Sequence, residues 1–211
     1  MEGKELKDTI IDIKKELRAN MNGIASAAMR QSEDYRVNFG VELPRIINIA
    51  SEFEASHELA QALWKESVRE CRILATILMP TERFDEELCD IWVEDIKTIE
   101  IAQIFCMNLM RRLKFASIKA FEWMASDKEM VQCCGYLTLC HVLRQGELTD
   151  RSADEFLDQA ATVLGQSKTE DESETNKSSV LRTQVFKALQ IFASQSEVNT
   201  EKVKKIADYL S

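Results

Sequence analysis

The sequence predicts an all-α protein, built as a right-handed superhelix of antiparallel helical hairpins (an α-α superhelix). Two prolines and six glycines in 211 residues leave nearly the whole chain free to form helices. From Leu43 to Ile206 one short amphipathic segment follows another, without the sustained alternation of a strand. Because such helices cannot bury their apolar faces alone, we expect them to stack and to present one concave face to a polymer or a protein.

Residues 1–34 are expected to form an N-terminal helical cap. Its first helix, 4–19, carries an apolar stripe at spacings of three to four residues, formed by Leu6, Ile10, Ile13 and Leu17. Asn22 and Gly23 interrupt this helix, and a second short helix follows at 24–30. In the connector after it, Gly40 permits an unusual backbone angle and Pro44 suits the first turn of a helix.

The remaining helices are expected at 44–53, 57–65, 68–79, 84–94, 98–113, 115–125, 127–144, 152–165, 178–194 and 199–209. Serine–x–x–glutamate capping boxes, in which each side chain bonds the other residue's backbone amide, predict three helix starts: Ser67–Glu70, Ser126–Glu129 and Ser152–Glu155. Paired off, the helices make hairpins of about 25 to 40 residues, near the length of HEAT-type units.

We expect one domain over residues 1–211, because a chain of this length can bury one sizeable core. Residues 167–179 contain no large apolar side chain. They cannot bury enough surface to become ordered and are predicted to form a flexible acidic loop.

The net charge of −9 argues against nucleic acid, but the charge is unevenly distributed along the chain. Residues 147–177 contain nine acids and three bases, whereas residues 96–120 contain five bases and one acid. The basic segment could hold phosphates despite the acidic total.

Several other classes of protein are disfavoured. The six cysteines lack metal-finger spacing and lie in apolar helical stretches, which is typical of buried thiols in a reducing compartment. Cys140 and His141 are adjacent on a helix and point apart, and with two histidines no metal-binding helix pattern exists. No apolar run approaches the ~20 residues of a membrane span. We therefore expect a cytoplasmic protein without metal, cofactor or membrane partner.

Three stretches carry a resemblance to a known family: 38–45 (NFGVELPR), 63–72 (LWKESVRECR) and 123–132 (WMASDKEMVQ). Their order and spacing are similar to those of the DNA alkylation repair family, the AlkD-type HEAT-like glycosylases. The resemblance implies a crescent of helical repeats that holds duplex DNA in its concave face. It also implies hydrolysis of the glycosidic bond of cationic alkylated purines, helped by a carboxylate, two tryptophans and arginines in the cleft.

The chain departs from this pattern at the chemical positions. Alignment with the family places Glu100 at the catalytic carboxylate, but Ile96 and Lys187 replace the two cleft tryptophans. Cys133 and Gln190 stand where the family has arginines. Whether the protein is an enzyme is thus left open, and the resemblance implies a divergent member.

The candidate DNA-binding cations are Arg72, Lys97, Arg111, Arg112, Lys114, Lys119 and Lys187. Ordinary interpretations exist beside the functional one. Glu100 would be favoured at a helix start, and Arg111 and Arg112 at a helix end, by the helix dipole alone. The three tryptophans, spaced among apolar residues, are expected in the core.

The favoured interpretation is a DNA alkylation repair-like protein that binds duplex DNA, plain or alkylated, on its concave face. Its N-alkylpurine glycosylase activity would be weak or lost. The alternative is a non-catalytic helical-repeat scaffold that binds another protein, which the net charge of −9 also suits.

Overall fold

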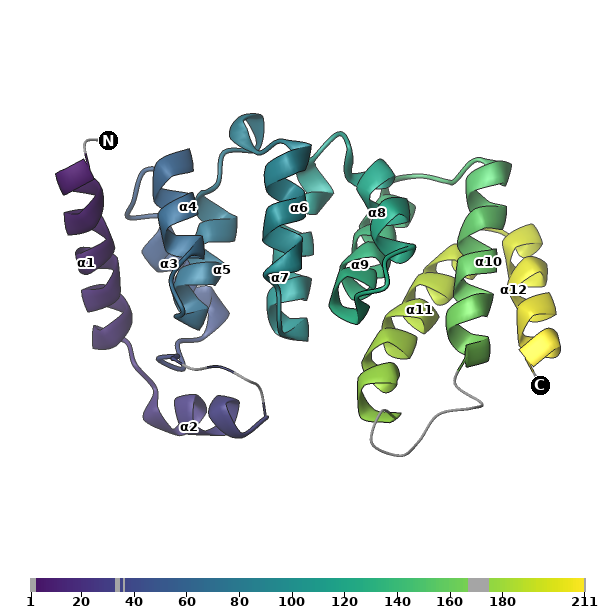
Figure 1. The fold of residues 1–211 in the computed structure, drawn as a ribbon, viewed down its shortest axis with the longest axis horizontal. Coiled ribbons are helices and arrows are strands. Elements are labelled where there is room, and N and C mark those ends of the chain that lie inside the picture. The colour runs from purple at the N-terminus through teal and green to yellow at the C-terminus, as the bar shows by residue number, and fades with distance from the viewer. Residues whose placement is uncertain (1–2, 33–34, 36, 167–174, 211) are drawn as a thin grey trace. The chain divides into compact units, whose positions relative to one another are not determined.

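A computed structural model describes residues 3–32, 35, 37–166 and 175–210. Every regular element in these ranges is helical, and Figure 1 follows the helices in chain order. The predicted all-α class is therefore confirmed. The chain divides into two compact units, Met1–Ile91 and Trp92–Ser211.

The first unit contains a run of short helices joined by tight connectors. These are α1 (Gly3–Ala19), α2 (Gly23–Ser32), α3 (Leu43–Ala50), α4 (His57–Trp64), α5 (Arg69–Leu78), the 3-10 turn η1 (Thr81–Arg83) and most of α6 (Glu86–Glu94). Ile13 and Leu17 of the predicted stripe on α1 are fully buried. α4 and α5 pack as an antiparallel hairpin, as the repeat interpretation expects.

The buried carboxylate of Glu70 holds the connector that precedes α3. It accepts hydrogen bonds from the backbone N–H groups of Phe39 (3.0 Å) and Val41 (3.2 Å). The neighbouring Arg69 guanidinium donates to both Glu70 and the Val41 carbonyl. Between these bonds Gly40 adopts φ +68°, a left-handed conformation that favours glycine, in agreement with the sequence prediction.

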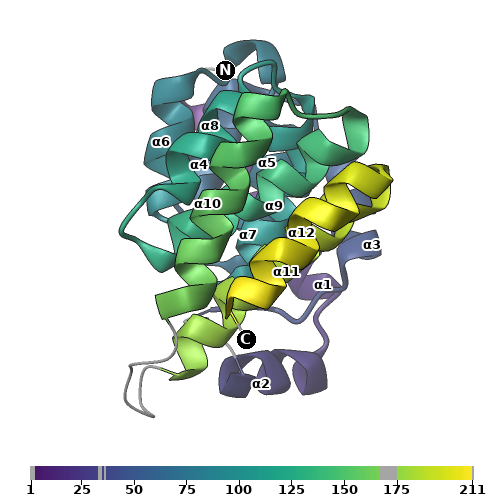
Figure 2. The ribbon, with the colours of Figure 1, turned by 90° about the vertical axis from the view of Figure 1, so that its right-hand side faces the viewer.

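The second unit alternates between two sets of helices. It contains α7 (Ile99–Asn108), the 3-10 turn η2 (Met110–Arg112), α8 (Ala116–Met124), α9 (Glu129–Gln145), α10 (Asp150–Gln166), α11 (Thr175–Gln195) and α12 (Glu197–Leu210). α9 packs against α7, α8 and α11, and Figure 2 shows α8 and α10 to the left of α9. α7, α9 and α11 thus form a continuous row of neighbouring helices.

Side-chain contacts show that α7 and α9 run in the same direction. Lys128, just before α9, pairs with Glu94, which ends α6 shortly before α7 begins. At the far ends, Gln145 of α9 donates to the carbonyl of Arg111 in η2. α11 ends at the same level, since Gln195 donates to the Leu143 and Gly146 carbonyls.

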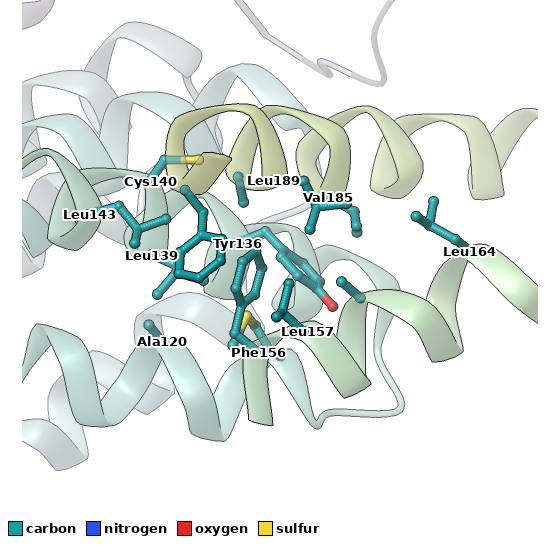
Figure 3. Close-up of a cluster of buried hydrophobic side chains, with 14 of the residues drawn as sticks. Ala120, Tyr136, Leu139, Cys140, Leu143, Phe156, Leu157, Leu164, Val185 and Leu189 are labelled. Atoms are coloured by element: carbon teal, nitrogen blue, oxygen red, sulfur yellow. The ribbon is translucent and has the colours of Figure 1, made fainter. Parts of the chain in front are cut away.

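The core of the second unit lies between α8, α9, α10 and α11. The ring of Phe156 packs edge-on against Phe192 at 5.6 Å and lies 6.5 Å from Tyr136, and all three side chains are buried. Figure 3 shows the aliphatic side chains gathered around Tyr136 and Phe156. This core fixes the row of helices that carries the candidate site.

Helix starts differ from the predicted capping boxes. α5 begins after Val68, and Glu70 bonds the connector instead of Ser67. α9 is preceded by Lys128, and α10 is capped by Thr149, which accepts from Ser152. Side-chain caps instead occur at Ser56 for α4 and Thr98 for α7. The first capping box does not form because the Glu70 carboxylate accepts hydrogen bonds from the connector before α3 instead of from the Ser67 amide.

The boundaries differ at two further places. The helix predicted at 98–113 breaks into α7 and η2 around the buried Leu109. Of the predicted acidic loop, residues 167–174 lie outside the described part, and residues 175–179 already belong to α11.

Candidate nucleic-acid interface

α7 leaves one stripe of side chains free of the core. Cys106 faces α9, where its thiol bonds the Cys134 carbonyl. The residues to one side of it, between about a sixth and a third of a turn away, are Glu100, Gln103 and Met107, spaced three and four residues apart. Gln103 is exposed and the other two are half-buried. Glu100 therefore lies on the accessible side of α7, in its first turn.

α9 continues this surface between its two neighbours. On the side of α9 toward α7, the Thr138 hydroxyl donates to the Cys106 sulfur. On another side, Tyr136 is buried in the hydrophobic core. Leu137, His141 and Arg144, at spacings of four and three, occupy the stripe between these contacts. The first two are half-buried and Arg144 is exposed.

α11 adds the third stripe. Val185, Ala188 and Leu189 are buried in the core, whereas Thr183, Lys187, Gln190 and Ser194 are exposed on the opposite side of the helix. The exposed set again follows the spacing of three to four residues that marks one helical face. We call the combined surface, from Glu100 on α7 through His141 and Arg144 on α9 to Lys187 on α11, the α7–α9–α11 face.

Positive charge collects at the end of this face where α7 and α9 finish. The pKa of His141 is lowered, first by burial and then by the positive charges of Arg144 and Arg111. Burial raises the pKa of the Cys140 thiol to about 11, against the opposing influence of Arg144 and Lys187. Arg111, Arg144 and Lys187 thus act on neighbouring groups, and none of them forms an ion pair with a described residue.

The predicted cations do not all lie together. Lys97 stands before α7 and Arg111 after it, so a ten-residue helix of about 15 Å separates them. Lys97 is exposed and donates to the Glu94 carbonyl, beside the Glu94–Lys128 ion pair. Lys119 of α8 is 5% exposed and pairs with Glu122 at 2.7 Å. Lys119 is therefore poorly placed for phosphate contact.

The remaining predicted cations fall into two groups. Arg112 and Lys114 are exposed next to Arg111, around η2. Arg72 belongs to the first unit, where its guanidinium lies 5.3 Å from the ring centre of Trp64 and donates to the Glu66 carbonyl. This cation–π contact gives Arg72 a structural role within the first unit.

Two of the substituted cleft positions are internal. Ile96 is 1% exposed and Cys133 is 0% exposed. Burial raises the pKa of the Cys133 thiol to about 12, so the thiol remains protonated at neutral pH. Trp64, Trp92 and Trp123 are also buried, as the sequence predicts. No tryptophan of the chain is therefore available to line an open cleft.

Sequence reasoning missed Arg144 and His141 as members of the face. From the sequence, His141 is considered as a partner for Cys140 and as a metal ligand, but not as part of a binding surface. The signal was present in the spacing of Leu137, His141 and Arg144, which marks a stripe once the flanking helices are known. Among the described residues no cluster of three metal-ligating side chains occurs, and no described helix combines the length and apolarity needed to cross a bilayer.

Fold and face together define a helical-repeat protein with an accessible polar surface of net positive charge on one row of helices. The model of the DNA alkylation repair enzyme family matches residues 13–178. The chain belongs to this family. A comparison with curated protein sequences gave no match.

The fold also matches a solved structure from a new family of proteins related to the HEAT-like repeat DNA glycosylases, with affinity for branched DNA structures. The TM-score is 0.79 at 16% identity, and the match covers 95% of this chain and 82% of that one. This likeness confirms the HEAT-like helical fold that the hairpin lengths predicted.

Proposed function

We propose that the protein binds DNA through the α7–α9–α11 face and contacts the sugar-phosphate backbone. The observation that carries the proposal is the group of Arg111, Arg144 and Lys187, which are exposed and have no acidic partner among the described residues. In a chain of net charge −9, cations left unneutralised on one face favour an anionic ligand. Membership of a DNA repair family supports the same ligand.

The bound DNA would be duplex, plain or alkylated, and branched forms are included because the structural relative is described as having affinity for them. Base excision by the family mechanism would be weak or lost. Glu100 keeps a carboxylate on the accessible stripe of α7. However, Ile96 and Cys133, which align with cleft residues of the family, are buried and cannot touch a nucleotide.

The test is a titration of three labelled probes at two salt concentrations: a plain duplex, a duplex with 7-methylguanine, and a four-way junction. Released base is measured in the same samples. The proposal predicts binding that weakens steeply with salt and little or no base release. If release does occur, Glu100→Gln should abolish it, because the amide cannot stabilise positive charge on the sugar. Salt-insensitive or absent binding contradicts the proposal.

The alternative function is a protein-binding scaffold. It is favoured by isolated apolar side chains at the surface of the second unit, Ile118 (57% exposed) and Val198 (66% exposed). The same titration separates the two, since a scaffold without phosphate contacts would show no salt-dependent DNA binding.

A further inference from the structure

α11 is depleted of negative charge. Its 21 residues, Thr175–Gln195, include no aspartate or glutamate, whereas the whole chain contains 36 such residues in 211. A stretch of this length would carry three or four acids at the average frequency. Its charged residues are all positive: Lys177, Arg182 and Lys187. Such a helix suits contact with a polyanion.

The exposed side of α11 also presents an aromatic ring. Phe186 is 48% exposed, in contrast to Phe192 on the same helix, which is 1% exposed in the core. Phe186 is three residues after Thr183 and four before Gln190, so it adjoins the exposed polar stripe of α11. Lys187 is the next residue, about 100° around the helix, and its ammonium donates to the side-chain oxygen of Gln184 at 3.4 Å.

Along its own side of the helix Phe186 is therefore flanked by a hydroxyl and an amide, with an ammonium group on the adjoining side and no carboxylate on the helix. Cations and hydrogen-bond donors are the groups that contact phosphate and sugar, and exposed aromatic rings are the groups on which bases stack. An uncharged protein surface or a neutral lipid would account for the ring but not for the absence of acids along all of α11.

Building on the proposed function, we infer that Phe186 is a stacking platform for an unpaired nucleotide, whose phosphate lies against Lys187. In an intact duplex each base is already stacked on its neighbours, so its ring face is covered. An unpaired base at a flap, gap or branch exposes this face, and stacking tolerates any base because each has a π-face. Phe186 would thus favour DNA with unpaired nucleotides over fully paired DNA.

The first experiment measures affinity by fluorescence anisotropy for a duplex with a short single-stranded thymidine flap and for the same duplex without it. Phe186→Ala should weaken flap binding on the order of tenfold and leave binding of the paired duplex within about twofold. Phe186→Trp should retain flap binding, because an indole also stacks. Ile118→Ala, which removes an exposed apolar side chain on α8, is the matched control and should change neither affinity.

The second experiment uses fluorescence. All three native tryptophans are buried, with exposures of 4%, 2% and 4%, so bound DNA cannot reach their rings. Phe186→Trp therefore adds the one indole whose emission contact with DNA can change. Flap DNA should quench this new emission, and the paired duplex should quench it much less. Ile118→Trp, at a position 57% exposed on α8, should not respond to either probe.

The outcomes separate this inference from the proposed function. If the native protein binds duplex with strong salt dependence but Phe186→Ala binds the flap normally, the stacking role is wrong and the DNA-binding proposal stands. An equal loss on both probes also overturns the stacking role. If the native protein binds neither probe, both proposals fail together.

Discussion

Gln145 donates a 2.9 Å hydrogen bond from its side-chain nitrogen to the backbone carbonyl of Arg111. The bond fastens the turn η2 to the last residue of α9. It therefore holds Arg111 near His141 and Arg144, where the positive end of the α7–α9–α11 face lies. A side chain that touches no ligand itself would thus position a cation of the proposed interface.

The first prediction concerns this bond. Gln145→Ala should weaken duplex binding about two- to threefold, because Arg111 loses its fixed position. Its thermal midpoint should stay close to that of the native protein, since Gln145 is exposed. Anisotropy titrations and thermal scans measure the two effects. Unchanged affinity would show that η2 is positioned without the bond.

The second prediction concerns the close crossing of α8 and α9 at Gly135. A Cβ atom there would lie 2.6 Å from the Met124 nitrogen and 2.9 Å from the Ala120 carbonyl oxygen, both of which are backbone atoms. Gly135→Ala should lower the free energy of unfolding by about 2 kcal/mol, because the two helices must separate. Urea denaturation is the measurement.

Gly146→Ala is the matched control, since a Cβ atom at Gly146 meets nothing within 4 Å. It should change the free energy of unfolding by less than about 0.5 kcal/mol. Equal stabilities for the two variants would mean that the α8–α9 crossing is looser than the structure shows.

The third prediction concerns the buried carboxylate of Glu70. Glu70→Gln replaces one acceptor oxygen with a donor facing the Phe39 or Val41 amide, or the Arg69 guanidinium. The cost should be about 3 kcal/mol, since the buried Arg69 guanidinium loses its contact with a carboxylate and a buried backbone amide loses its acceptor. Glu52→Gln, at an exposed position of the same unit, should be neutral. A Glu70→Gln protein of native stability by urea denaturation would refute this role.

The fourth prediction concerns the thiols. All six cysteines are buried and free, and burial raises the pKa values of Cys71 and Cys133 from 9.0 to about 12. The native protein should therefore react slowly with a thiol reagent near pH 8, whereas denaturant should expose all six groups. Rapid reaction of the native protein would contradict the burial.

The same pKa shifts predict a loss of stability in alkali. A raised native pKa means that the folded state favours the protonated thiol. The stability that comes from burying the protonated thiol is therefore fully present below about pH 9. This contribution is lost as the pH rises through the native pKa values near 12. The urea midpoint of unfolding should accordingly decline above pH 9. A urea midpoint that rises above pH 9 would contradict this prediction.

Most of the fold could be predicted from local patterns. The apolar stripe of the first helix, the scarcity of prolines and the placement of tryptophans all depend on helix periodicity, which the sequence displays directly. The capping boxes failed because a serine–glutamate spacing does not reveal competing tertiary partners. Glu70 is the example, since its partners lie about thirty residues earlier in the chain.

The candidate site was less predictable. Lys119 looked equivalent to Arg111 in the sequence, but its contact with Glu122 and its burial follow from the packing of α8. Arg144 was overlooked because its neighbours on the face come from α7 and α11, at sequence distances where periodicity carries no information. Which cations share a face depends on the order in which the helices pack.

The most direct test of the proposed interface is the salt dependence of duplex affinity for the double variant Arg144→Gln/Lys187→Gln. Each phosphate contact contributes roughly 0.9 to the slope of log affinity against log salt, so the double variant should lower the slope by about 2. Arg151→Gln, at an exposed position on α10, should leave it unchanged. A slope that is native in the double variant, or reduced as much by Arg151→Gln, would contradict DNA binding on the α7–α9–α11 face.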